Sequence, residues 1–204
     1  MIYEVRTYTL ATGAVPQYEE SFARAMHHRE KYSKLTAYWH TEIGPLNQVV
    51  HIWAYDDLAH RAKVREAVAK EPNWPPAEAH LIQHMESEIV VPAPFMRPIE
   101  PGHYGNIYEM RIYDCQPWAM PEIMKRWGEK IPGREKYSPC LACGYTELGG
   151  LNKLIHIWPY ESMEERARIR QESVKSGDWP PNTREFILRM QNKILIPAEF
   201  SPVK

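Results

Sequence analysis

Residues 2–10 alternate between apolar and polar side chains, which is the two-residue period of a β-strand. The alternation is cleaner over residues 108–113, where Tyr108, Met110 and Ile112 share one face. Residues 35–42 and 47–55 have the same period, and residues 87–91 and 192–196 read as short strands, each stopped by a proline. These patterns predict four strands in each half of the chain.

Helical spacing of apolar residues fills the intervals between these strands. It predicts one helix from Val15 to about Lys31 and a shorter one from Leu58 to Ala67. Pro75 and Pro76 suit the first turn of a third helix, which we expect to continue through Ile82. Arginines four residues apart on the shorter helix predict a solvated face with salt bridges. They are Arg61 and Arg65, and Arg166 and Arg170 in the second half.

The whole pattern occurs twice. The segment 47–55 returns almost unchanged as 152–160, so that His51 and His156 stand 105 positions apart. The same spacing relates Tyr3 to Tyr108 and Arg6 to Arg111. The chain therefore divides into a first repeat, 1–97, a linker, 98–107, and a second repeat, 108–204.

Each repeat has the strand and helix order of a ferredoxin-like unit, an antiparallel sheet with helices on one face, and the fold class is α+β. Such a sheet leaves its other face bare. Two tandem sheets can place their bare faces together and pair their edges, which removes exposed apolar surface and unpaired strand edges. We therefore expect both repeats to close one barrel within the chain.

Composition narrows the classes of function. The chain has 204 residues, of which 44% are hydrophobic and 25% charged, and its formal net charge is −1. A globular protein with interspersed charges has no electrostatic footprint for nucleic acid or an anionic membrane, so neither partner is expected. No basic and apolar leader and no apolar run of membrane-spanning length is present, and we predict a cytoplasmic protein.

Cysteine usage and catalytic motifs add little chemistry. Cys115, Cys140 and Cys143 all lie in the second repeat and are expected to be free thiols, buried or half-buried. Cys140 and Cys143 have C-x-x-C spacing, but they lie on a predicted strand and no second pair completes a zinc site. The motifs of zincins, phosphate-binding loops and α/β-hydrolases are also missing. No metal or cofactor is predicted.

Two motifs are shared with a known family. They are E-x-R-x-Y, beginning at Glu4 and at Glu109, and L-N-x-x-x-H-I-W-x-Y, beginning at Leu46 and at Leu151. With these motifs, nearly the whole chain resembles the NIPSNAP family, twice over. The resemblance implies the dimeric α+β barrel fold, usually closed by two chains and here by one. The superfamily it implies includes cofactor-free monooxygenases, haem enzymes and proteins that degrade small molecules, while the biochemical role of the NIPSNAP branch is undefined.

The polar strand faces carry the candidate site. If the helices cover the aliphatic faces, the polar faces look into the barrel lumen, where they would form a pocket for a small polar or aromatic molecule. The second strand has diverged between the repeats, since His40 corresponds to Tyr145, and this favours the end of the first repeat. The candidate catalytic residues are Glu4, Arg6, His40 and His51. The candidate ligand-binding residues are Tyr8, Trp53, Tyr55, Glu109, Arg111, Tyr113, His156, Trp158 and Tyr160.

The sequence leaves several roles open for these residues, and with them the question of whether the protein is an enzyme. His51 could act as a general base while Arg6 holds an anionic oxygen, or His51 or His156 could be an axial haem ligand. The polar face could instead be a set of buried ion pairs and hydrogen bonds in a packed barrel. In that case the chain would be an interaction or scaffold protein that binds partners near Trp74 or Trp179. The barrel-containing chain could also pair again as a homo-oligomer.

Overall fold

The computed structural model describes all residues, 1–204, and each repeat has the expected order of strands and helices. The first repeat comprises β1 (Ile2–Leu10), α1 (Val15–Arg29), β2 (Leu35–Ile43), β3 (Gln48–Tyr55), α2 (Leu58–Val68), a 3₁₀ turn η1 (Ala77–Leu81) and β4 (Ile82–Pro92). The second repeat comprises β5 (Ile107–Cys115), α3 (Met120–Arg134), β6 (Ala142–Leu148), β7 (Lys153–Tyr160), α4 (Met163–Lys175), a 3₁₀ turn η2 (Arg184–Phe186) and β8 (Ile187–Pro197).

The predicted third helix of each repeat is wrong. Only one 3₁₀ turn forms, Ala77–Leu81, and Ile82 already begins β4, five residues before the predicted strand. β4 pairs with β1 from Tyr3 opposite Val90 to Leu10 opposite Ile82, so it follows β1 over almost its whole length. These ladder hydrogen bonds override a helical spacing that extends over too few residues to form a stable helix.

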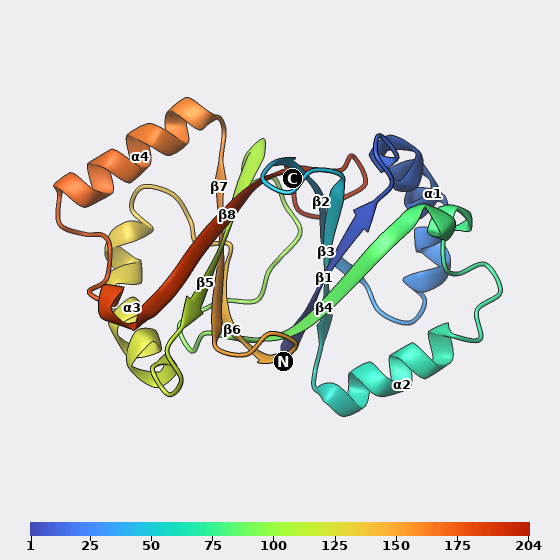
Figure 1. Cartoon of the computed structure of the whole chain (residues 1–204), viewed down its shortest axis with the longest axis horizontal. Coiled ribbons are helices and arrows are strands. Elements are labelled where there is room, and N and C mark those ends of the chain that lie inside the picture. The colour runs from blue at the N-terminus through green and yellow to red at the C-terminus, as the bar shows by residue number, and fades with distance from the viewer.

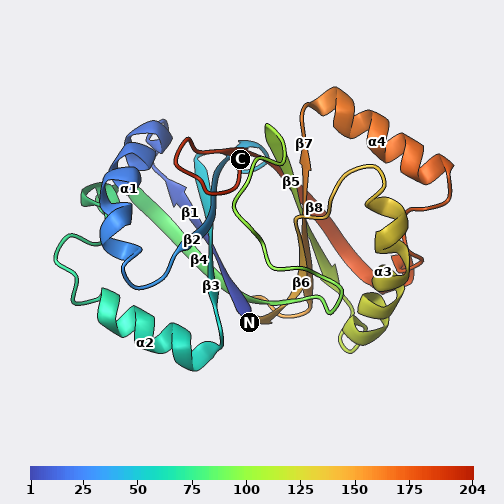
Figure 2. The same cartoon turned by 180° about the vertical axis from the view of Figure 1, so that it is seen from behind.

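The eight strands close into one antiparallel barrel in the order β1-β3-β2-β8-β5-β7-β6-β4. Within each repeat four strands pair as expected, and the repeats join where β2 pairs with β8 and β4 with β6. No sheet edge is left open, which confirms the barrel within one chain. Figure 1 shows α1 and α2 covering one side of the barrel and α3 and α4 the other, and Figure 2 shows the same arrangement from behind.

The barrel interior is filled by aliphatic and aromatic side chains from both repeats. Trp39 reaches across it to Tyr108, with their ring centroids 5.3 Å apart. The remaining void, beside Tyr3 and Ile157, measures only about 20 Å³. The other interior residues are Val5, Ala37, Val50, Ile52, Val90, Met110, Ile112, Leu141, Ile155, Leu195 and Val203. A packed interior has no room for a ligand, so the predicted pocket in the lumen is wrong.

The two strand faces point the opposite way from the prediction. The aliphatic face looks into the barrel, and the polar and aromatic face lies under the helices, where Tyr8, Trp53 and Tyr55 pack with Phe22 of α1. The interior is closed off by the whole barrel, so it takes mostly aliphatic side chains. The layer under the helices reaches solvent at its edges, where long polar side chains can end in water.

The cysteines are buried free thiols, as expected. Burial raises the pKa of Cys115 to about 11, and it raises the pKa of Cys140 well above its ordinary value. No group of three or more His, Cys, Asp or Glu side chains is arranged to hold a metal ion. None of the helices combines the length and the apolar composition that crossing a bilayer requires.

Candidate functional site

His51 lies at the centre of the layer between the first sheet and its helices. Strand β3 places it opposite Arg6 of β1. Its imidazole ring stacks against Tyr38, with centroids 5.8 Å apart, and meets the edge of Tyr8 at 4.8 Å. Trp53, two residues further along the same strand face, donates its indole N–H to His51 Nδ1 over 2.7 Å. The other ring nitrogen, Nε2, is buried and has no hydrogen-bond partner.

The indole fixes the protonation of this histidine. Because Nδ1 accepts a hydrogen bond, the proton of the neutral ring is on Nε2. Burial, together with the positive charge of Arg6, lowers the pKa of His51 to about 3, so the ring is neutral at physiological pH. A neutral ring with its proton on Nε2 is a hydrogen-bond donor at that atom. This contradicts the general-base hypothesis.

The same tautomer argues against an axial haem ligand. A metal-ligating histidine binds through an unprotonated nitrogen and donates its other N–H to a neighbouring group. His51 has the reverse arrangement, since Nδ1 accepts from Trp53 and Nε2 bears the proton. In the second repeat, Trp158 donates to His156 Nδ1 over 2.6 Å, so the argument holds there too.

Glu4 holds several cationic side chains around the site. Its Oε1 accepts hydrogen bonds from Arg6 Nη1, Arg61 Nη2 and Ser87 Oγ, each over 2.7 Å, and lies 3.8 Å from Arg65 Nη1. Burial alone would raise the pKa of Glu4, but the hydrogen bonds from Arg61 and Ser87 and the charge of Arg6 outweigh it and lower the pKa to about 2. The carboxylate is therefore ionised and fully buried.

A further arginine, Arg29 of α1, closes the other side of the site. Its guanidinium lies over the Trp53 ring, 4.2 Å from the centroid, and donates to Tyr55 Oη over 2.9 Å and to Ser33 Oγ over 2.7 Å. Arg6 donates from Nε to Tyr8 Oη over 2.6 Å. Each aromatic residue on the polar strand face thus positions a cation or the histidine.

Between these groups and α2 lies a cavity of about 290 Å³, which we call the arginine cavity. Three arginines and one glutamate line it, so its wall carries two more positive than negative charges while His51 is neutral. Arg65 stands at the mouth with 47% of its side chain exposed. The lining residues are Glu4, Arg6, Tyr8, Arg29, His51, Trp53, Arg65, Val68, Ala69, Trp74, Pro75 and Met85.

The second repeat builds the same constellation. Glu109 Oε1 accepts from Arg111 over 2.7 Å, from Arg166 over 2.6 Å and from Asn192 over 2.9 Å. Arg170 approaches the other carboxylate oxygen to 3.5 Å. Arg111 also donates to Tyr113, Arg134 to Tyr160, and His156 Nε2 is again buried without a partner. Two independent copies of one geometry indicate that the polar face has a defined structure in each repeat.

The structure brings most of the predicted site residues together, but not His40. Its ring Nδ1 lies 2.9 Å from Glu19 Oε1 of α1, and His40 does not line the arginine cavity. The His40 side chain is partly buried, and its hydrogen bond to Glu19 raises its pKa. In each repeat the other candidates share the layer between the sheet and its helices. In the first repeat they are Glu4, Arg6, Tyr8, His51, Trp53 and Tyr55.

Sequence reasoning missed the helical arginines as parts of the site. Arg29 was not singled out, and Arg61 and Arg65 were assigned to a solvated face, although both approach the buried Glu4. The signal was available, since Arg134, Arg166 and Arg170 stand 105 positions further on. Both repeats retain these helical arginines and a glutamate on the first strand. Opposite charges that are retained together predict a contact between the helix and the sheet.

Comparison with known proteins agrees with the duplicated barrel. The sequence model of the family described as NIPSNAP matches residues 3–97 and 108–202. The human protein NipSnap homolog 3A is 32% identical over 218 residues, covering 100% of this chain and 86% of the relative. An uncharacterised NIPSNAP domain protein from Burkholderia xenovorans is 36% identical, covering 48% of this chain and 100% of that chain, with a TM-score of 0.46. A putative monooxygenase from Lactobacillus acidophilus shares the fold over 96% of this chain and 92% of its own, with a TM-score of 0.61 and 10% identity.

Proposed function

The chain belongs to the NIPSNAP family, and we propose that its first repeat binds a small organic anion in the layer between the sheet and the helices. One observation carries the proposal. The Nε2–H of His51 is a buried donor without a partner, and His51 lines a cavity whose wall is net positive. An acceptor oxygen with a negative charge satisfies both features at once.

The energetics favour a ligand at this position. A buried donor without a partner costs about 1–3 kcal/mol, and a bound acceptor recovers that cost. The arginines are already held in place, since Arg6 and Arg29 each make two side-chain hydrogen bonds to neighbouring groups. A preorganised cation loses little side-chain entropy when an anion binds.

The size and walls of the cavity define the ligand class. A volume of about 290 Å³ is near the lower end for small-molecule sites, which span roughly 300–1,000 Å³. Tyr8, Trp53, Trp74 and Met85 supply apolar and aromatic walls beside the cations. These features suit a carboxylate or enolate on a body about the size of one aromatic ring.

The proposal concerns binding and charge stabilisation rather than proton transfer. His51 is neutral and carries its proton on Nε2, and the Glu4 carboxylate, with its pKa near 2, is a weak base. Burial raises the pKa of Tyr8, so its phenol keeps its proton. Chemistry at this site would be limited to substrates that enter already ionised, because no group in the cavity is suited to remove a proton.

Titration calorimetry with benzoate and its uncharged isostere benzamide tests the proposal, in buffer of low chloride concentration. We expect benzoate to bind at one site per chain and at least about tenfold more tightly than benzamide, because a hydrogen bond to a charged group contributes roughly 1.5–3 kcal/mol. His51→Phe should abolish this binding. His40→Phe is the matched control and should retain it.

Two results would contradict the proposal. Equal affinity for benzoate and benzamide would show that the cavity does not select charge. Unchanged stoichiometry in a folded His51→Phe variant would show that the histidine donor is not part of the site.

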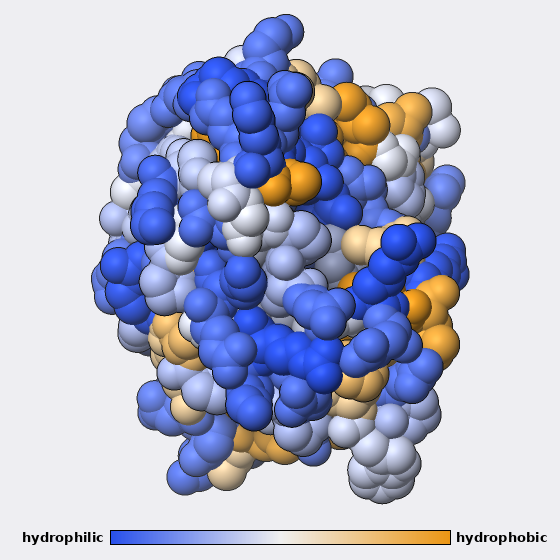
Figure 3. All heavy atoms as spheres, turned by 90° about the vertical axis from the view of Figure 1, so that its left-hand side faces the viewer, coloured by the Kyte–Doolittle hydropathy of each residue, from blue (hydrophilic) through white to orange (hydrophobic).

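The alternative role, a non-enzymatic interaction protein, finds less support. Trp74 packs edge-on against Phe22, with centroids 5.4 Å apart, and lines the arginine cavity rather than standing free on the surface. Figure 3 shows that the flank carrying α3 and α4 is mostly hydrophilic, with apolar atoms in separate small groups. Protein-binding surfaces usually present a larger continuous apolar patch.

A further inference from the structure

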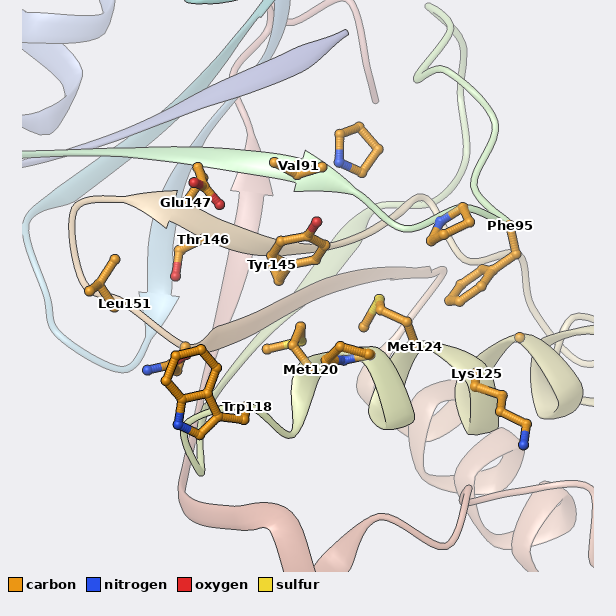
Figure 4. Close-up of a pocket in the computed structure, with 15 residues that line it drawn as sticks. Val91, Phe95, Trp118, Met120, Met124, Lys125, Tyr145, Thr146, Glu147 and Leu151 are labelled. Carbon is orange, nitrogen blue, oxygen red and sulfur yellow. The ribbon is translucent and has the colours of Figure 1, made fainter.

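A larger cavity lies beside the second repeat's helix α3, and its lining is unlike that of the arginine cavity. It measures about 980 Å³ and lies between the first half of α3, strand β6 and the segment that follows β4 (Figure 4). Figure 4 shows Tyr145 of β6 on one side of this space and Met120 and Met124 of α3 on the other, with Phe95 beyond Met124. The lining residues are Val91, Pro92, Pro94, Phe95, Trp118, Met120, Pro121, Met124, Lys125, Gly128, Tyr145, Thr146, Glu147, Leu151 and Asn152.

The first repeat holds an ion pair where the second has this cavity. Met124 and Tyr145 stand 105 positions after Glu19 and His40, whose side chains meet over 2.9 Å. The duplicated helix and strand therefore bring the same two positions together in both repeats. In the second repeat a thioether and a phenol have replaced the charged pair, which makes the contact region apolar.

Neighbouring differences open the space further. In the first repeat, Phe200 packs on the Tyr38 ring with centroids 4.8 Å apart. The counterpart of Tyr38 is Cys143, which has no ring, and the counterpart of Phe200 is Phe95. Phe95 instead lies against Gly128, where a Cβ atom would stand 3.1 Å from its Cδ1. The loss of one ring leaves Phe95 as a wall of the cavity.

Trp118 at the cavity edge departs from ordinary residue preferences. Its φ is 69°, in the left-handed region, and 93% of its surface is exposed. The equivalent residue is Gly13, with φ 76°, whose N–H donates to Asn47 Oδ1 over 3.0 Å. The second repeat makes no corresponding hydrogen bond between Trp118 and Asn152. A tryptophan in the left-handed region with its indole in water is unfavourable on both counts.

We propose that this cavity binds an uncharged, planar aromatic molecule, against which Trp118 stacks. Four aromatic or thioether side chains, Phe95, Met120, Met124 and Tyr145, offer the contact surface, and methionines adapt to varied ring shapes. Stacking on the ligand would bury the exposed indole of Trp118. The cavity volume of about 980 Å³ is more than three times the 290 Å³ of the arginine cavity. It therefore suits a ligand of two or three fused rings rather than one ring.

The charges at the cavity favour an uncharged ligand over an anion. Lys125 and Glu147 are the only charged residues in the lining, they have opposite signs, and both are exposed. Neither makes an ion pair within the chain. Their charges therefore stay in water at the rim, and the interior presents no net charge to select an ionised ligand. This separates the cavity from the arginine cavity, whose wall is net positive.

The probe for this site is N-phenyl-1-naphthylamine, which is uncharged and fluoresces more strongly in apolar surroundings. We expect saturable binding at one site per chain. Met124→Glu with Tyr145→His restores the pair found in the first repeat and should weaken binding at least about tenfold. Arg65→Ala, in the arginine cavity, is the matched control and should leave probe binding unchanged, so the two sites are tested separately.

A second variant avoids the risk that a buried double substitution unfolds the chain. Trp118→Gly introduces the residue that the first repeat has at this position, so the backbone accommodates it. We expect its affinity for the probe to fall about threefold to tenfold, since an aromatic pair contributes roughly 0.5–1.5 kcal/mol beyond burial. The thermal midpoint should stay the same or rise, because the left-handed residue is now glycine.

Three results would overturn the proposal. One is the absence of saturable fluorescence enhancement with the wild-type chain. Another is unchanged affinity in both the double variant and Trp118→Gly. The third is a concentration-dependent dimer in light scattering that excludes the probe and dissociates in Trp118→Gly, which would show that a second copy of the chain covers the cavity.

Discussion

Replacing Glu4 by Gln removes the negative charge that holds Arg6 and Arg61 together, with almost no change in shape. The pKa of Glu4 is lowered from 4.5 to about 2, so its charged form is favoured by roughly 2.5 pKa units over an unperturbed carboxyl group. At 1.36 kcal/mol per unit, this corresponds to about 3 kcal/mol of stability at neutral pH. Glutamine resembles the protonated acid, and Glu4→Gln should therefore cost about 3 kcal/mol.

The assay is thermal and urea unfolding at neutral pH. For a chain of this length, a loss of about 3 kcal/mol lowers the thermal midpoint by roughly 6–12 °C. Glu109→Gln should have a similar effect, because Glu109 accepts the equivalent hydrogen bonds from Arg111 and Arg166. Glu20→Gln is the matched control. Its partner Arg24 is one helical turn away and both side chains are exposed, so the cost should stay below about 0.5 kcal/mol.

The same substitution distinguishes a binding site from a purely structural ion cluster. Glu4→Gln raises the net positive charge of the arginine cavity wall by one, so we expect benzoate to bind that repeat more tightly although the protein is less stable. Stability within about 0.5 kcal/mol of wild type would refute the reasoning about the buried carboxylate. Weaker benzoate binding by a folded Glu4→Gln chain would refute the role of wall charge in recognition.

Acid unfolding should begin well above the pKa of the carboxylates. The pKa of His51 is lowered to about 3 and that of His156 well below 6.5, so between these values the unfolded chain binds more protons than the folded chain. The free energy of unfolding should therefore fall as the pH drops from 6.5 toward 3, and urea titrations across this range measure it. Constant stability over this range would contradict the buried neutral rings. Trp39→Ala should cost about 3–5 kcal/mol in urea unfolding, because the ring fills the barrel interior, and a cost near zero would mean that the interior is not packed. Gly144→Ala should also destabilise the fold, since a Cβ atom there would overlap the Val91 carbonyl oxygen where β6 meets β4, and a midpoint equal to wild type would contradict that close approach.

The sequence predicted the strands, the main helices and the closed barrel because these follow from period, duplication and the need to cover sheet edges. Period two shows which residues share a face, as His51 and Trp53 do, but not whether that face meets the helices or the interior. Amphipathic side chains made the choice ambiguous, since Tyr8 and Trp53 can bury a ring and still use a polar atom. The arginines of α2 held the missing information, because Arg61 reaches the buried Glu4 only if the polar face lies under the helix.

The chemistry of the site depended on atoms that a sequence does not place. Which nitrogen of His51 bears the proton follows from the hydrogen bond that Trp53 donates, and that bond exists because both side chains lie on one face of β3. The large cavity of the second repeat could be anticipated only in part. The change from His40 to Tyr145 indicated that the repeats differ, but the space depends on where Phe95 packs once the ring of Tyr38 is lost.

We propose that the chain binds anions under its helices and not inside its barrel. Diffraction from crystals soaked in 4-bromobenzoate tests this most directly, because the anomalous signal of bromine locates the ligand without reference to the protein. We predict one bromine peak per chain, in the arginine cavity, with the carboxylate beside His51 and Arg65. Bromine inside the barrel, or none in the arginine cavity while that cavity stays open to solvent, would contradict this mode of binding.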